Sequence, residues 1–503
     1  MNALQNPLRG GRRLWIGIPS TELDVATEGL LTDLQPGGVI LFRRNIDSAQ
    51  QVKKLTTALR ETVGESLHIC IDQEGGRVVR FPDGVTFFPG NMSLGAWACT
   101  DPQEAREMAF AQGWHTGSEL RDLGIDVNLA PCVDLVASAD SRGIGSRSFG
   151  SDPQRALQLA TALGEGMRSA GVLDCWKHFP GLGRVTVDPH FGLPSTDPDE
   201  TGSDLKPFAG AAAAGAAIVM TSHVIARALD PDQPVTTSVR AVNALRNDLG
   251  FQGAVMTDCL EMGGVSGLSP AEVAQGAVEA GHDILLVSHT EELQREIHQQ
   301  VEREIARDEG HRRSVERLDV LSSAPRPTAA ADQMSGPEVA QRICRGGVSL
   351  LRGSLPPLPL KDEWKLILPE QFSHSPVEDP RPADELELLA SELPAVTTVF
   401  KFDSVKDLPT LSAREDDSTA GRHWILALQG ARLQTDCREI LETVAQRLES
   451  LVILLLDDPR DLAVMPEAEN LAVLCAYGTR PLHLQILAEV LRGETRPNGG
   501  QPL

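Results

Sequence analysis

From residue 14 to about residue 290 the chain repeats one pattern, in which a short apolar run is followed by a turn and an amphipathic helix. The runs are four to seven residues long, and several are rich in β-branched or other large apolar side chains. This is typical of strands that are buried on both faces of a parallel sheet. The runs are Leu14–Ile18, Val39–Phe42, Leu67–Ile71, Asp126–Ala130, Leu173–Phe179, Ala217–Thr221, Ala254–Thr257 and Asp283–Val287.

Eight strands that alternate with helices, such as those expected over Ala49–Val63 and Asp152–Gly171, predict an α/β fold of the (β/α)8 barrel type. An open, doubly wound sheet is the alternative, and periodicity alone does not separate the two. The polar residues favour the barrel, because barrel enzymes build their sites from the carboxyl ends of several strands. Many of the apolar runs end in polar or ionisable side chains: Arg43-Arg44-Asn45, Asp72-Gln73-Glu74, Asp134, Lys177-His178, His223 and Asp258.

A second, smaller α/β sandwich domain is expected after the barrel. The Ser/Pro-rich stretch from Ser322 to Thr328 is typical of a linker. We therefore expect a catalytic barrel over residues 1–322, a linker over residues 323–335 and a sandwich domain over residues 336–503. Its strands are expected at Lys365–Leu368, Ala395–Phe400, Trp424–Leu428, Leu451–Leu456 and Leu471–Ala476.

Charge and composition exclude several classes of function. The formal net charge is -24, so the chain repels polyphosphate and is not expected to bind nucleic acid. No uninterrupted apolar stretch is long enough for a membrane span, and the N-terminus lacks the pattern of a secretory signal. The eight cysteines form no CxxC pair and no zinc-ligand spacing with histidine. They are expected to be buried thiols in a reducing compartment, and the cytoplasm is the expected location.

The segment from Lys177 to Pro194 combines glycines, prolines and five ionisable side chains, which is typical of a functional loop. Asp188 and His190 lie two residues apart, with Pro189 fixing the backbone between them. A carboxylate that holds an imidazole fixes its tautomer and raises its basicity, so this histidine could act as a general acid and base. The alternative is an ordinary turn at Asp188 with His190 on the surface.

Three further segments carry candidate residues. Asp258 ends an apolar run, where a partly desolvated carboxylate could act as a nucleophile, although an Asp there could also cap a helix. Asp72 and Arg80 flank paired glycines and could bind sugar hydroxyls, while Glu74 is expected to hold loop backbone. That segment is not GxGxxG, so dinucleotide binding is disfavoured. Arg147 lies in a glycine-flanked loop and could equally be a solvated side chain.

Taken together, the motifs resemble glycoside hydrolase family 3, and in particular its β-N-acetylglucosaminidase branch, whose marker is the long KHFPGxG…D-x-H loop. The resemblance covers roughly residues 12–320 and is weaker after residue 336. It rests on IDQEGGRVVRF, IGSRSFG, KHFPGLGRVTVDPHFGLP, VMTSHVI and GFQGAVMTDCLEM, with support from GVILFRRNI and AGHDILLV.

The resemblance implies a (β/α)8 barrel with Asp258 as nucleophile and Asp188 with His190 as the acid/base dyad. It also implies that the N-acetylglucosamine ring is bound by Asp72, Arg80, Arg147, Lys177 and His178. The expected reaction is retaining hydrolysis of N-acetylglucosamine from peptidoglycan fragments during recycling. No metal or organic cofactor is implied, and the expected partner is a small saccharide.

Two positions depart from the family pattern. Leu182 stands where the family usually has a second histidine in KHFPGHG, and Pro189 stands where it often has serine. Pro189 is expected to stiffen the loop and slow its opening. Three other functions stay open: a phosphorylase, because a neutral histidine base does not repel phosphate; a β-glucosidase; and a glycan-binding protein without catalysis.

Overall fold

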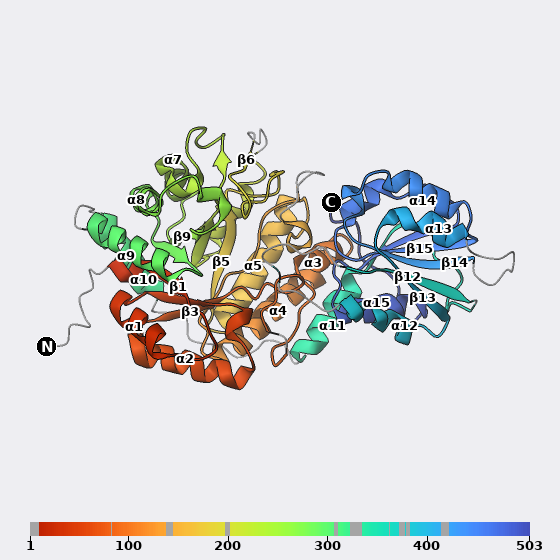
Figure 1. Cartoon of the computed structure of the whole chain (residues 1–503), viewed down its shortest axis with the longest axis horizontal. Coiled ribbons are helices and arrows are strands. Elements are labelled where there is room, and N and C mark those ends of the chain that lie inside the picture. The colour runs from red at the N-terminus through yellow and green to blue at the C-terminus, as the bar shows by residue number, and fades with distance from the viewer. Residues whose placement is uncertain are drawn as a thin grey trace.

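Two units lie side by side in the computed structural model, a barrel and a smaller sandwich (Figure 1). The structure describes residues 10–81, 83–136, 144–196, 202–305, 310–321, 334–361, 363–371, 378, 383–413 and 422–503.

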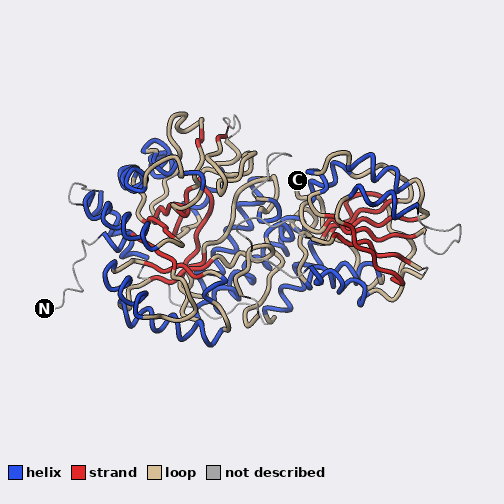
Figure 2. Tube along the Cα trace, in the orientation of Figure 1, coloured by secondary structure: helices blue, strands red, loops and turns tan. Residues whose placement is uncertain are grey.

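The strands of the first unit close into a barrel in which every neighbouring pair is parallel, in the order β1-β10-β9-β7-β5-β4-β3-β2. Figure 2 shows strands, in red, at the centre of this unit and helices, in blue, around them. This confirms the predicted (β/α)8 barrel, and each predicted run overlaps one of its strands. The strands are β1 (Leu14–Gly17), β2 (Gly38–Leu41), β3 (His68–Ile71), β4 (Val127–Asn128), β5 (Leu173–Phe179), β7 (Ile218–Thr221), β9 (Ala254–Cys259) and β10 (Ile284–Val287).

Helices surround the barrel, and their starts follow capping rules. The Ser48 side chain accepts a hydrogen bond from the backbone of Gln51, and the Asp152 side chain accepts bonds from Gln154 and Arg155. The helices are α1 (Val25–Leu34), α2 (Ala49–Val63), α3 (Asn91–Trp97), α4 (Pro102–Asp122), α5 (Pro153–Ser169), α6 (Lys206–Ala213), α7 (Val239–Asn243), α8 (Pro270–Ala280), α9 (Glu291–Ile305) and α10 (Gly310–Leu321). A two-stranded sheet of β6 (Ser195–Thr196) and β8 (Ile225–Ala226) lies beyond the strand ends.

The barrel interior shows how the strands aim the polar residues that follow them. Side chains two residues apart on a strand point to the same face. Cys70, Cys175 and Met256 belong to one buried apolar cluster. The residues two positions further along the same strands are polar and lie at the carboxyl ends, where barrel enzymes place their sites: Asp72, Lys177 and Asp258.

The second unit has a six-stranded sheet in the order β11-β16-β15-β14-β12-β13, in which β11 runs antiparallel to β16. Apolar clusters fill both faces of the sheet. Helices α13 and α14 lie on one side and α12 and α15 on the other (Figure 1). The elements are α11 (Gly336–Gly347), β11 (Ser349–Gly353), β12 (Trp364–Pro369), α12 (Leu388–Glu392), β13 (Val396–Phe402), α13 (Leu408–Ala413), β14 (His423–Leu428), α14 (Cys437–Ala445), β15 (Ser450–Leu455), β16 (Leu471–Cys475) and α15 (Pro481–Leu491).

The five strands predicted for this domain are present, and β11 is the strand that the sequence analysis missed. Only its first residue is fully buried, so it lacks the continuous apolar run that marks a central parallel strand. The predicted linker lies mostly in residues 322–333, which are outside the described residues. The domain boundaries at residues 322 and 336 therefore stay a prediction.

The two units share packing and backbone contacts. Met92 and Ala96 of α3 belong to an apolar cluster that otherwise consists mainly of sandwich residues. The C-terminal tail continues this contact, because the Gly500 N–H donates to the Ala96 carbonyl and the Ser151 N–H donates to the Pro502 carbonyl. Within the described ranges, no helix is both long and apolar enough to cross a bilayer.

Two glycines allow α4 and α5 to pack closely. A Cβ at Gly113 would lie 2.0 Å from the Leu163 carbonyl oxygen, and one at Gly166 would lie 2.2 Å from that of Phe110. These are backbone atoms, so the clash is relieved only if the two helices move apart.

We expect Gly113→Ala to lower the free energy of unfolding by about 1–3 kcal/mol through overpacking. Gly29→Ala in α1 is the matched control, because no atom lies within 4 Å of a Cβ there, and it should stabilise slightly through helix propensity. Urea denaturation of both variants tests this, and equal midpoints for the two would contradict it.

Candidate active site

A pocket of about 500 Å³ opens at the carboxyl ends of the barrel strands. Its size suits a small-molecule ligand. Seven of the eight predicted site residues line it: Asp72, Arg80, Arg147, Lys177, His178, His190 and Asp258. The eighth, Asp188, lies behind His190 and is hydrogen-bonded to it. The fold therefore gathers candidate residues from four segments of the sequence into one cavity.

Asp188 and His190 form a closely coupled pair. Oδ1 of Asp188 lies 2.6 Å from Nδ1 of His190 and also accepts the His190 backbone N–H at 2.9 Å. Burial opposes ionisation of Asp188, but its hydrogen bonds to His190 outweigh that effect and hold the pKa of the carboxyl below its usual value. The ionised carboxylate fixes Nδ1 as the protonated ring nitrogen, which leaves Nε2 to exchange protons.

The loop that carries this pair docks onto the segment that follows Asp258. The Gly264 N–H donates to the Pro189 carbonyl at 2.9 Å, and the Gly263 N–H donates to the His190 carbonyl at 3.2 Å. A Cβ at Gly263 would lie 2.8 Å from the His190 carbonyl oxygen, so only glycine permits this approach. The loop and the end of β9 thus meet through backbone at the rim of the pocket.

Asp258 lies at the end of β9, on the face that Met256 directs into the barrel. Its carboxylate is half-buried, and Oδ1 accepts the N–H of Cys259 at 2.7 Å. The next carbonyl, that of Cys259, is bound by the ring of the buried His223 at 2.8 Å. The backbone directly after Asp258 is therefore held by two hydrogen bonds, one to the Asp258 carboxylate and one to His223.

Buried charges alternate in sign across the floor of the pocket. Lys177 Nζ lies 2.6 Å from a carboxylate oxygen of Asp72 and 2.6 Å from one of Glu74. Arg147 binds both oxygens of Glu74, at 2.8 and 2.9 Å. Arg80 lies 3.5 Å from the other oxygen of Asp72. These contacts join four of the predicted sugar-binding residues.

The pairing keeps these groups ionised despite burial. Desolvation raises the pKa of Glu74, but the charges of Arg147 and Lys177 outweigh it and hold that pKa far below its usual value. Burial likewise disfavours the charged form of Lys177, yet Asp72 and Glu74 raise its pKa above the usual value. Glu74 was expected to hold loop backbone; instead its carboxylate pairs with two cations of the pocket, which corrects that expectation.

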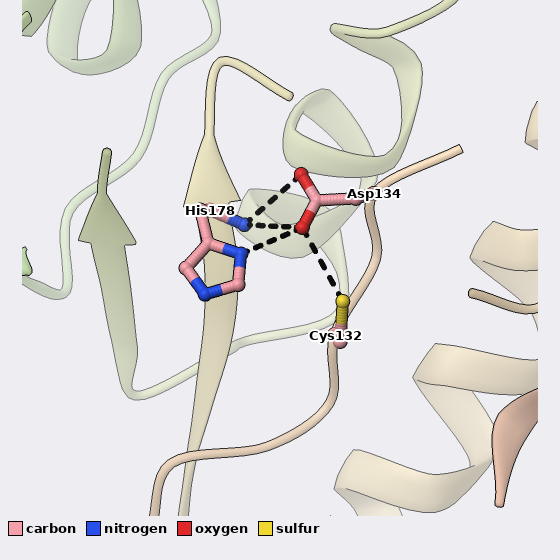
Figure 3. Close-up of side chains that lie close together, drawn as sticks. All are labelled: Cys132, Asp134 and His178. Carbon is pink, nitrogen blue, oxygen red and sulfur yellow. Dashed lines mark hydrogen bonds and ion pairs between the residues drawn. The ribbon is translucent and has the colours of Figure 1, made fainter. Parts of the chain in front are cut away.

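His178 is positioned by Asp134, a residue to which the sequence analysis gave no role. Figure 3 shows the fully buried Asp134 carboxylate accepting bonds from the His178 backbone and from its Nδ1, the latter at 2.6 Å. The same carboxylate accepts the Leu182 N–H at 2.7 Å. Asp134 therefore fixes both the His178 ring and the start of the loop that carries the Asp188–His190 pair. The sequence offered one indication that Asp134 belongs to the site, namely its place after the fourth apolar run.

Two groups of side chains in the described ranges have the geometry of metal ligands, Cys132–Asp134–His178 and Cys259–Glu261–His289. The donor atoms of the first bond to one another (Figure 3). In the second, Glu261 accepts the backbone N–H groups of residues 288–290. The Arg44 guanidinium lies 3.0 Å from Nδ1 of His289, where it would repel a cation. Both groups therefore act as hydrogen-bonded supports.

One side of the pocket mouth was not assigned from the sequence. Phe42, Arg44, Glu261 and His289 line it, and the Arg44 guanidinium lies 4.5 Å from the centre of the Phe42 ring. Such a wall of aromatic and charged groups adjoins the position of the predicted nucleophile. Arg44 belongs to a polar run noted at the end of the second predicted strand, but nothing in that run alone indicated that it lines the cavity.

Comparisons with known proteins show which family the chain resembles. The model of the glycosyl hydrolase family 3 N-terminal domain matches residues 16–321. A protein from Stenotrophomonas maltophilia named beta-hexosaminidase is 40% identical over 292 residues, which are 57% of this chain and 86% of that protein.

Solved structures extend the similarity. A family 3 beta-N-acetylglucosaminidase from Paenibacillus superposes with a TM-score of 0.86 at 31% identity and covers 99% of both chains. NagZ from Neisseria gonorrhoeae, solved with N-trifluoroacetyl-D-glucosamine, gives a TM-score of 0.53 at 31% identity over 62% of this chain and 98% of its own. The match of the family model over more than half of the chain shows that this protein belongs to glycosyl hydrolase family 3 and is a glycoside hydrolase.

Proposed function

We propose that this enzyme is a retaining exo-β-N-acetylglucosaminidase that removes terminal β-linked N-acetylglucosamine from peptidoglycan-derived saccharides. The observation that carries the proposal is the shared pocket. It presents a half-buried carboxylate, Asp258, and an imidazole, His190, to the same cavity, beside a floor of ion-paired polar groups. The names of relatives at 39–40% identity, all beta-hexosaminidases, support the sugar.

In the proposed first step, Asp258 attacks the anomeric carbon while His190 donates a proton to the departing glycosidic oxygen. A glycosyl–Asp258 ester forms and the aglycone leaves. In the second step His190, now neutral, accepts a proton from water, and the water displaces Asp258. Two inversions return the original configuration. The Asp188 carboxylate stabilises the imidazolium form of His190 that the second step generates.

The floor of the pocket suits the sugar ring. Asp72, Arg80, Arg147, Lys177 and His178 offer donors and acceptors that hydroxyl groups can share, and most are held rigidly by ion pairs with one another or with Glu74. A rigid polar site binds without losing much side-chain entropy. The acetamido group would lie beneath the Asp188–His190 loop, and the aglycone beside Phe42 and Arg44. On this assignment, the aglycone is the N-acetylmuramic acid unit of a peptidoglycan fragment, and the enzyme acts in peptidoglycan recycling.

We expect Asp258→Asn to lower kcat on p-nitrophenyl N-acetyl-β-glucosaminide by at least about a thousandfold, because the amide cannot form the ester. Mass spectrometry of the unmutated enzyme treated with a 5-fluoro N-acetylglucosaminide, which keeps the acetamido group, should find the sugar on the peptide that contains Asp258. A label on another carboxylate would contradict the assignment.

For His190→Ala we expect the loss to depend on the leaving group. On a disaccharide, whose alkoxide needs a proton, kcat should fall by about 10²–10⁴-fold. With p-nitrophenol the first step should change much less, since that leaving group departs as a stable anion. Burst kinetics on the aryl glycoside would reveal slow hydrolysis of the ester. Equal losses of the first step on both substrates would speak against His190 as the acid.

The remaining alternatives give different products. For a hydrolase we expect the same rate in phosphate-free buffer and no sugar 1-phosphate when phosphate is added. We also expect the enzyme to prefer p-nitrophenyl N-acetyl-β-glucosaminide strongly over p-nitrophenyl β-glucoside. Chromatography of the products with and without phosphate makes the measurement. A rate that requires phosphate would identify a phosphorylase, and an inactive unmutated enzyme would favour a glycan-binding protein.

Pro189 should restrict the loop of the acid/base pair. Its side chain is buried and its carbonyl accepts the Gly264 N–H. We expect Pro189→Ser to speed hydrogen exchange of the backbone around residues 185–192, because serine leaves φ less restricted. Exchange identical to that of the unmutated protein would show that Pro189 does not set the mobility of the loop.

A further inference from the structure

Two loops of the pocket are held by one carboxylate of the sandwich domain. Asp457 follows β15 and is 4% exposed. Its Oδ2 accepts a bond from Nη1 of Arg77 at 2.7 Å, and its Oδ1 accepts the Ser146 hydroxyl hydrogen. Arg77 also donates from Nε to Glu378, another residue beyond the barrel, at 2.9 Å. Arg77 and Ser146 belong to different barrel loops.

These loops carry the two partners of a buried ion pair in the pocket. Arg77 lies at the tip of a tight turn that the Glu74–Val78 and Gly75–Val78 backbone bonds close. Gly75 and Gly76 adopt φ of 89° and 57°, which lets the chain reverse between Glu74 and Arg77. Ser146 directly precedes Arg147 in the chain. Asp457 therefore bonds to one side chain of the Glu74 loop, Arg77, and to one side chain of the Arg147 loop, Ser146.

The sandwich domain contributes no side chain to the lining of this pocket, since every described lining residue precedes residue 290. Its influence must pass through the loops. The Glu74–Arg147 pair needs distances of 2.8 and 2.9 Å to keep both charges satisfied away from water. A small shift of either loop would disturb this pair and, through Glu74, Lys177.

We propose that Asp457 is a positioning residue for sugar binding: it ties the Arg77 turn to the Ser146 loop, so that the Glu74–Arg147 pair in the pocket floor keeps its geometry. The effect on binding rests on the proposed function, whereas the effect on the loops does not. Asn91 supports the same loop from the barrel side by donating to the Arg147 carbonyl at 2.7 Å. Asn91 contacts only the Arg147 loop, whereas Asp457 bonds to both loops and so links them.

The test is Asp457→Asn, with Asp461→Asn as the matched control. Asp461 is also buried and lies four residues further along, but it binds the backbone of Ala431 and Arg432 within the sandwich domain. In Asp457→Asn we expect KM for the aryl N-acetylglucosaminide and Kd for N-acetylglucosamine to rise about tenfold, with kcat changed less than about threefold. Asp461→Asn should leave all three values near those of the unmutated enzyme.

Hydrogen exchange gives a readout that does not depend on turnover. Peptides covering residues 72–81 and 144–149 should exchange faster in Asp457→Asn and not in Asp461→Asn. Arg77→Met should reproduce the faster exchange of residues 72–81, and combining it with Asp457→Asn should add less than the sum of the two single effects, because both changes remove the Arg77–Asp457 ion pair. Ser146→Ala, which removes one bond, is the milder variant if Asp457→Asn folds poorly.

The outcomes separate the two proposals. An unmutated enzyme without turnover would overturn the proposed function, and the exchange data would still test Asp457. Unchanged exchange in both loops, or equal rises in KM for Asp457→Asn and Asp461→Asn, would overturn the positioning role. A lower melting temperature with unchanged KM would assign Asp457 to stability alone and would also overturn it.

Discussion

The pairing of buried charges is the constraint on which the pocket depends. Lys177, Glu74 and Arg147 each lie almost out of solvent, where an unpaired ion would cost several kcal/mol. Glu74 pairs with both cations, and Lys177 also pairs with Asp72. The same contacts that make burial tolerable also fix the polar groups in position. The floor of the pocket is therefore rigid before any ligand enters.

The wall of the pocket that carries the Asp188–His190 pair is held by backbone hydrogen bonds. The Asp188–His190 pair lies on a long loop that meets the end of β9 through backbone bonds to Gly263 and Gly264. Asp134 fixes the beginning of that loop at Leu182. A loop fastened at a few points can open locally more easily than the barrel itself. This arrangement combines a fixed floor with a wall that can move during substrate entry and product release.

Much of the architecture followed from local patterns. The eight apolar runs predicted the strands of a parallel sheet because strands buried on both faces need continuous apolar sequence, and the polar residues after them favoured a barrel over an open sheet. The strand β11 was missed because it lies mostly half-exposed at a sheet edge. Asp258 stood out as a polar residue after such a run, and Asp188 with His190 stood out by their spacing in a loop with five ionisable side chains. Glu74 and Asp134 stood in similar places, yet their roles depend on partners that a local pattern does not contain.

The sequence by itself determined where the strands lie and end and which of their side chains share a face, because the apolar runs and the two-residue period of a strand are local properties. Only the tertiary structure decided which charges pair and that a sandwich residue holds barrel loops. Arg77 and Asp457 are 380 positions apart in the chain, and Glu74 and Arg147 are 73 apart. Ion pairs form between groups that folding brings within a few ångströms, and no spacing along the chain encodes that proximity.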